Sequence, residues 1–155
     1  MHAPPGSGTR PALPAAPGDV DEPALRAFGR SLGAALRAPI LVAIRGELGA
    51  GKTTLVQEIA RGAGVSDEVT SPTFALVHEY VAPGTTVHHL DLYRLSGPGE
   101  LTNLGWDDIV GGEGIVLVEW PERAGGRLHS PRLDIVLRAV AGKPDRRTVE
   151  ATWTE

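Results

Sequence analysis

The sequence predicts an α/β fold of three layers, with helices flanking a mixed central sheet. Two short runs, 40–44 and 115–118, are almost wholly apolar, as expected of strands that are buried on both faces. A glycine-rich segment, 46–53, follows the first run and leads into a helical pattern of apolar residues. Other segments have the pattern of antiparallel strand pairs, so the predicted sheet contains parallel and antiparallel neighbours.

The glycine-rich segment matches the phosphate-binding pattern G-x-x-x-x-G-K-[ST] at every fixed position. A loop that wraps its N–H groups around phosphate needs glycine where φ is positive or where a Cβ would meet the ligand. Gly46, Gly49 and Gly51 stand at such places. A strand, this loop and a helix follow one another in the order that a P-loop requires, so the segment predicts binding of a nucleotide phosphate.

The residues at the end of this segment have side chains suited to phosphate and metal. Lys52 would reach phosphate oxygens, the Thr53 hydroxyl would take one coordination position of Mg²⁺, and Thr54 would add a phosphate contact. Of the 15 lysines and arginines in the chain, only two are lysines. A lysine at position 52 therefore indicates a site where a forked guanidinium group fits poorly.

The N-terminal part of the chain is predicted to be a disordered tail followed by a helix. Residues 1–18 are rich in Pro, Gly and Ala, which leaves 19–155 as a single P-loop domain. Asp21 suits the N-cap of the helix, Pro23 suits its first turn, and Pro39 ends it. The apolar residues that recur on one face are Leu25, Phe28, Leu32 and Leu36.

Further elements follow the P-loop helix. Strands at 75–81 and 86–92, joined by a turn at 83–84, are expected to form an antiparallel hairpin. A short helix is expected at 100–106, before the second central strand at 115–118.

The chain is predicted to end in two strands. These are 133–140 and 148–153, with a turn at 142–145 between them.

Two carboxylates are candidates for metal binding or catalysis beside the P-loop. Glu119 directly follows the second apolar run, where a P-loop protein commonly keeps a carboxylate that binds Mg²⁺ directly, binds it through water, or orients the attacking water. Asp91 shares one face of its strand with His89, whereas His88 faces the other way. Because adjacent histidines point to opposite faces, a transition-metal site is disfavoured here.

Three further residues have both a functional and an ordinary interpretation. Trp120 follows Glu119 and is either a wall of the nucleotide site or a packing residue. Ser71 and Thr73 lie in the loop after the P-loop helix, where nucleotide switches often keep a hydroxyl that senses the γ-phosphate. As plain turn residues they would be unremarkable.

Composition limits the classes of function. The net charge of −4 gives no basic field that attracts nucleic acid, so contact with RNA is expected only through a partner. The chain has no Cys, which excludes disulfides and thiolate metal sites. No apolar run approaches a membrane span, and the N-terminus does not resemble a signal peptide, so a cytoplasmic location is expected.

Four segments together resemble the TsaE family, bacterial P-loop ATPases required to make threonylcarbamoyladenosine in tRNA. They are the P-loop at 46–54, SPTF at 71–74, LDLYRL at 90–95 and VEWP at 118–121, and the resemblance runs from about 21 to 140. The family commonly has Asp at the position of Glu47 and Tyr at that of Phe74, and both differences keep the chemical character.

The resemblance implies binding and hydrolysis of ATP with Mg²⁺, in support of the TsaD and TsaB subunits that modify tRNA. It implies catalytic roles for Lys52, Glu119 and Asp91, with Thr53, Glu119 and Asp91 around the metal. It also implies that Glu22 lies near the adenine. The residues then expected to bind the nucleotide are Gly46, Glu47, Gly49, Ala50, Gly51, Lys52, Thr53, Thr54, Trp120 and Glu22.

Three alternatives remain for the P-loop. A small-molecule kinase needs an Arg-bearing lid, and no long Arg-rich insertion follows the P-loop helix. A GTP-dependent switch is suggested by D-x-x-G at 108–111, but this match follows a helix-like stretch and no N-K-x-D segment is present. A nucleotide-binding protein without hydrolysis is disfavoured by the intact Lys52, Thr53 and Glu119.

Overall fold

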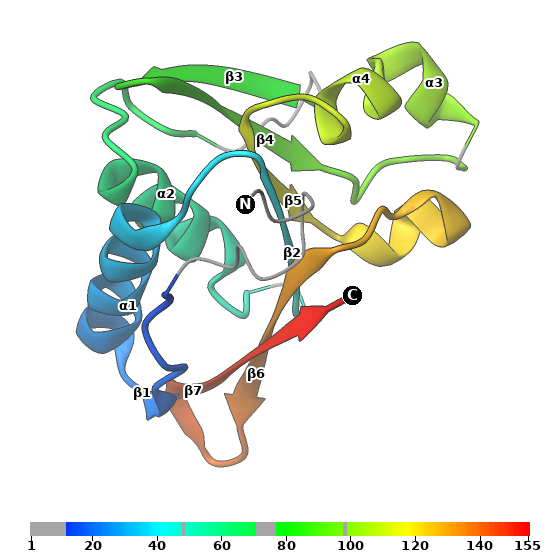
Figure 1. Cartoon of the computed structure of the whole chain (residues 1–155). Helices are drawn as coiled ribbons and strands as arrows, with labels where there is room; N and C mark the ends of the chain where they lie inside the picture. Colours follow the sequence, from blue (N-terminus) through cyan, green and yellow to red (C-terminus); the bar gives the residue numbers. More distant parts are fainter. Residues whose placement is uncertain (1–11, 48, 71–76, 98) are drawn as a thin grey trace.

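The central element of the fold is one twisted mixed sheet with helices on both faces (Figure 1). The computed structural model describes residues 12–47, 49–70, 77–97 and 99–155. Within these residues the strand order is β1-β7-β6-β2-β5-β4-β3. The strands are β1 Gly18–Val20, β2 Ile40–Arg45, β3 Val77–Ala82, β4 Thr85–Asp91, β5 Ile115–Glu119, β6 Arg132–Val140 and β7 Lys143–Thr154. The predicted three-layer α/β fold is confirmed.

The central strands are parallel, and the hairpins are antiparallel. β2 pairs in parallel with β5 and β6, and β4 pairs in parallel with β5. The predicted hairpin of β3 with β4 is present, and β7 pairs antiparallel with β6 and β1. In this register Glu119 lies opposite Ile44 on one side and Asp91 on the other. The carboxyl ends of β2, β5 and β4 therefore meet at one edge of the sheet.

Helices cover the two faces unequally (Figure 1). The longer helices α1 Glu22–Ala35 and α2 Lys52–Gly62 lie side by side on one face. The short helices α3 Glu100–Leu104 and α4 Trp106–Val110, with the 3₁₀ segment η1 Pro121–Arg127, lie on the other. The sheet has an apolar core on each face. Side chains of the buried strands point alternately to the two faces, so the same strands contribute residues to both cores.

Helices α1 and α2 are in direct backbone contact at two glycines. A Cβ added at Gly33 of α1 would lie 1.9 Å from the carbonyl oxygen of Ile59. One added at Gly62 of α2 would lie 2.1 Å from the carbonyl oxygen of Arg30. Only glycine fits at these two contacts, so the sequence itself fixes how near α2 lies to α1.

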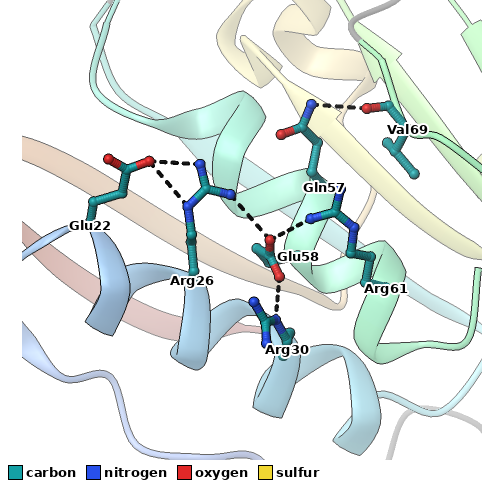
Figure 2. Close-up of polar contacts among 7 residues, drawn as sticks. All are labelled: Glu22, Arg26, Arg30, Gln57, Glu58, Arg61 and Val69. Carbon is teal, nitrogen blue, oxygen red and sulfur yellow. Dashed lines mark hydrogen bonds and ion pairs between the residues drawn. The ribbon is translucent and has the colours of Figure 1, made fainter.

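A buried carboxylate joins the same two helices (Figure 2). Glu58 of α2 is fully buried and accepts hydrogen bonds from Arg26 (3.2 Å) and Arg30 (2.5 Å) of α1 and from Arg61 (2.6 Å). Burial alone raises the pKa of the Glu58 carboxyl, but the guanidinium groups outweigh it and leave the pKa below its usual value. This cluster attaches the helix that follows the P-loop to its neighbour.

The structure differs from the sequence-based prediction in several elements. The helix expected at 100–106 is two helices, because Gly105 between them has a left-handed conformation. β7 begins at Lys143, within the segment expected to turn. β1 begins at Gly18, and Leu13 packs against the core, so the ordered chain starts before residue 19. Residues 1–11 lie outside the described part.

Candidate functional site

The P-loop connects the end of β2 to the start of α2. Gly51 caps α2 with a φ of 99°, and its carbonyl accepts a hydrogen bond from Leu55 N at 2.9 Å. A side chain is strained at this φ, and a Cβ there would lie 3.1 Å from Leu25 of α1. Since the first N–H groups of a helix have no partner within it, the loop presents free donors at the N-terminus of α2.

Lys52 lies across the mouth of the loop. Its ammonium group donates to the carbonyl oxygens of Gly46 and Glu47, the latter at 3.0 Å, and lies 4.0 Å from the centroid of a Trp120 ring. Burial lowers the pKa of Lys52 below its usual range, and the carboxylate of Glu119 opposes that shift. An ammonium group whose hydrogen bonds go to neutral carbonyls is well placed to donate to phosphate oxygens instead.

Glu119 is the last residue of β5, and its carboxylate meets the first turn of α2. The side chain is buried, and Thr53 Oγ1 lies 3.1 Å from its Oε1 and 3.3 Å from its Oε2. A hydroxyl has one hydrogen to donate and two lone pairs, so Thr53 can bind this carboxylate and still offer a lone pair to a metal. His89 Nε2 of β4 lies 2.6 Å from Glu119 Oε2.

Asp91 ends the neighbouring strand β4 and faces the same space. Its Oδ1 accepts a hydrogen bond from Tyr93 N at 3.0 Å. A cavity of about 410 Å³ brings the predicted phosphate and metal residues together. Its lining is Gly49, Gly51, Lys52, Thr53, Thr54, Asp91, Tyr93, Glu119 and Trp120.

Trp120 forms one wall of this cavity. It has a left-handed backbone with a φ of 56°, a strained conformation for a residue with a bulky side chain. Its ring lies 4.9 Å from that of Tyr93 and covers Lys52. Trp120 thus lines the cavity and also packs against a core cluster, so both interpretations of this residue are compatible with the structure.

A second cavity, of about 420 Å³, adjoins the first. The two share Gly49, Gly51 and Thr54, and the second is also lined by Glu22 at the start of α1. Arg147 of β7 reaches this cavity and donates to the carbonyl oxygens of Ala50 (3.1 Å) and Gly49 (3.0 Å). Glu22 itself accepts a 2.6 Å hydrogen bond from Arg26. Another cavity, of about 460 Å³, lies between the loop and β6, and its lining includes Gly46, Glu47, Gly49, Ala50, Trp120 and residues 136–139.

Three residues of the site, Tyr93, His89 and Arg147, were missed by reasoning from the sequence, and Tyr93 lines the cavity beside Asp91. His89 shares its strand face with Asp91, which alternation predicts, but contact with Glu119 depends on the parallel pairing of β4 with β5. Arg147 is almost a hundred residues from the loop that it contacts, and no local pattern indicates it. Ser71 and Thr73 lie outside the described residues.

The donor set suits a hard cation. A hydroxyl and two carboxylates line one cavity, and Mg²⁺ is commonly held by one or two such oxygens together with phosphates and water. In the described part of the chain, no group of three or more His, Cys, Asp or Glu side chains is arranged to hold a metal alone. The oxygen donors therefore fit Mg²⁺ that arrives with a nucleotide.

Comparison with known proteins gives consistent matches. The sequence profile of the family "Threonylcarbamoyl adenosine biosynthesis protein TsaE" matches residues 20–149. A protein of this name from Haemophilus influenzae is 44% identical over 98 residues, which is 63% of this chain and 61% of that protein. One from Streptomyces coelicolor is 42% identical over 125 residues, covering 78% and 84% of the two chains.

A solved structure agrees with these matches. The crystal structure of Bacillus subtilis YdiB superposes with a TM-score of 0.71 at 28% identity, covering 88% of this chain and 82% of that one. The match spans only 61% of the Haemophilus influenzae relative's length, and the same share of a relative from Nostoc. In the described residues no helix combines the length and apolar character needed to cross a bilayer.

Proposed function

The chain belongs to the TsaE family of threonylcarbamoyl adenosine biosynthesis proteins, and we propose that it is a Mg²⁺-dependent ATPase supporting this modification of tRNA. The observation that carries the proposal is the hydrogen bond between Thr53 Oγ1 and Glu119 Oε1, at 3.1 Å. It joins the P-loop to a buried carboxylate on the adjacent strand, the arrangement that P-loop enzymes use around a metal–nucleotide complex.

Phosphate binding is assigned to the loop and to Lys52. Free N–H groups at the start of α2 and the lysine ammonium group both favour negative charge in this place. On arrival of the phosphates, Lys52 exchanges the carbonyl oxygens of Gly46 and Glu47 for phosphate oxygens. This exchange replaces neutral acceptors by charged ones, which makes stronger hydrogen bonds.

Thr53, Glu119 and Asp91 are the residues proposed to hold Mg²⁺. The ion, when bound, neutralises charge that develops on the phosphate oxygens. Thr53 offers a hydroxyl lone pair, whereas Glu119 and Asp91 are available to bind directly or through water. Under this proposal, one of the two carboxylates would accept a hydrogen bond from the water that attacks the phosphate.

Rate enhancement would come from position and charge. No nucleophilic side chain is required, because water attacks phosphate once it is oriented and the developing charge is neutralised. Trp120 and Tyr93 border the cavity with aromatic rings, which limits the access of bulk water. Glu22, which lines the adjoining cavity, is proposed to lie near the adenine.

TsaD and TsaB are the proposed partners, and tRNA is reached only through them. The names of the matched relatives support the pathway, and the net charge of −4 argues against a direct attraction to the RNA backbone. A cytoplasmic location belongs to the same proposal.

Calorimetric titration of the full chain with ADP, with and without Mg²⁺, tests the nucleotide site. We expect ADP to bind the wild type. Lys52→Ala should bind ADP at least about a hundredfold more weakly, because it loses the charge-assisted hydrogen bonds from the lysine to the phosphates. Binding of ADP that is unchanged in Lys52→Ala would refute the assignment of this loop. Transfer of phosphate from ATP to a small molecule would favour the kinase alternative instead.

A further inference from the structure

His89 is a fully buried histidine whose ring is directed at the catalytic carboxylate. It lies on β4 two residues before Asp91, on the sheet face covered by α1 and α2. Its Nε2 is 2.6 Å from Glu119 Oε2. The contact is long-range in sequence, and the parallel pairing of β4 with β5 creates it.

The chemistry of this contact defines the direction of the hydrogen bond. An ionised carboxylate can only accept, so Nε2 carries the hydrogen and donates it to Glu119. Within the described residues the other ring nitrogen, Nδ1, has no hydrogen-bond partner. An unpaired polar atom in a buried place costs free energy, which an apolar side chain would avoid. A purely structural role therefore does not require an imidazole at this position.

Thr53 and His89 both contact the carboxylate of Glu119, and Thr53 Oγ1 lies within 3.3 Å of both of its oxygens. The hydroxyl of Thr53 is nearest to Oε1, and the imidazole of His89 is nearest to Oε2. The hydrogen bond from β4 to Oε2 restricts rotation of the carboxylate and favours the orientation in which Oε1 is directed at the P-loop. The Thr53 contact is the weaker of the two by distance.

We propose that His89 is a positioning residue, which donates Nε2–H to Glu119 Oε2 and so holds Oε1 toward Thr53 and the bound nucleotide. This inference rests on the proposed function, because it assigns a role within the same site. Since His89 contacts Glu119 but is not itself among the residues that line the cavity, its loss should change turnover and the Mg²⁺ requirement more than nucleotide affinity.

Two amide substitutions separate the hydrogen bond from other effects. His89→Gln carries an N–H donor as many bonds from Cα as the histidine Nε2, so it can still reach Glu119. His89→Asn carries the same group one carbon shorter and cannot. The matched control is His88→Asn, because that side chain points to the opposite face of the same strand.

The measurements are steady-state ATP hydrolysis and calorimetric binding of ADP at a series of Mg²⁺ concentrations, with the full chain. For His89→Asn we expect kcat to fall about tenfold, KM for ATP to stay within about twofold, and the half-saturating Mg²⁺ concentration to rise severalfold. His89→Gln should keep most of the wild-type kcat and of the wild-type affinity for Mg²⁺. His88→Asn should resemble the wild type. Equal kinetics and Mg²⁺ dependence in all variants would overturn the inference while leaving ATP hydrolysis intact. A wild type that neither binds nor hydrolyses nucleotide would remove the proposed function and the inference with it.

A measurement on the wild type decides the matter if a His89 variant does not fold. Long-range ¹H–¹⁵N spectra report which ring nitrogen carries the hydrogen. We expect the His89 Nε2–H proton to be strongly shifted downfield in the wild type and to lose that shift in Glu119→Ala. A His89 ring protonated only at Nδ1 would contradict the proposal.

Discussion

Thr53 and Glu119 are 66 residues apart in the chain, and their side chains are joined by a hydrogen bond of 3.1 Å. The pair forms because β5 lies beside β2 in parallel, so that the end of β5 and the first turn of α2 meet. Thr53 comes from the phosphate loop, and Glu119 comes from a strand that is buried along its whole length. The proposed chemistry depends on this meeting.

Glu119→Gln and Asp91→Asn should separate binding from hydrolysis. Each change removes a charge and keeps the size of the side chain, so we expect ADP binding to persist and ATP turnover to fall at least about tenfold. Calorimetry for ADP and a phosphate-release assay for ATP measure the two quantities. Near wild-type turnover in either variant would remove that residue from the mechanism.

Arg147 should matter for nucleotide affinity although it lies far from the P-loop in sequence. It donates to the carbonyl oxygens of Gly49 and Ala50, and under the proposed function these hydrogen bonds would keep the two oxygens turned away from the phosphates. We expect Arg147→Gln to weaken ADP binding about tenfold. The adjacent Arg146, which pairs with Asp19 on the surface, supplies the control Arg146→Gln. Equal affinities for the two variants would contradict the role of Arg147.

Glu58 should contribute stability that depends on pH. Its pKa in the folded protein is below the unfolded value, so its contribution is fully present above the unfolded pKa and is lost as pH falls through the folded pKa. Glu58→Gln is expected to lower the free energy of unfolding by about 2 kcal/mol at neutral pH, and by less in acid. Urea unfolding at a series of pH values from about 3 to about 7 measures this difference, because carboxyl groups titrate within that range.

The exposed Glu22 is the matched control for that experiment. Its carboxylate pairs with Arg26 at the surface, so Glu22→Gln should cost about 0.5 kcal/mol or less. Glu58→Gln that is no more destabilising than Glu22→Gln, at every pH, would mean that the buried cluster does not hold α1 to α2.

Gly33→Ala should destabilise the fold by forcing α1 away from α2. The added Cβ would overlap the carbonyl oxygen of Ile59, and overpacking of this kind costs about 1–3 kcal/mol. Gly126→Ala is the control, because a Cβ there meets no other atom within 4 Å. Thermal unfolding of the two variants should differ by several degrees, and equal melting temperatures would contradict the close contact.

The parts of the fold that depend on local pattern were predictable. The P-loop, the two apolar strands and the helix beginning after Asp21 each follow from a few neighbouring residues, and the structure contains them. The split of the predicted helix at Gly105 was not foreseen, because an isolated glycine does not reveal whether its φ is positive.

Contacts between distant strands could not be predicted in the same way. Alternation placed His89 on the same face as Asp91, yet nothing local shows that β4 pairs with β5 and brings the imidazole to Glu119. The same holds for Arg147, whose contact with the P-loop depends on the order of the sheet. The residue types of the site were thus visible in the sequence, but its supporting contacts required the structure.

The most direct test of the proposed function is steady-state ATP hydrolysis by the purified chain, alone and with the TsaD–TsaB heterodimer from the same source. We expect a low rate alone, a rate at least about tenfold higher with the heterodimer, and no activity in Lys52→Ala under either condition. A rate that the heterodimer leaves unchanged, but that a small metabolite raises, would contradict a role as the ATPase of tRNA modification.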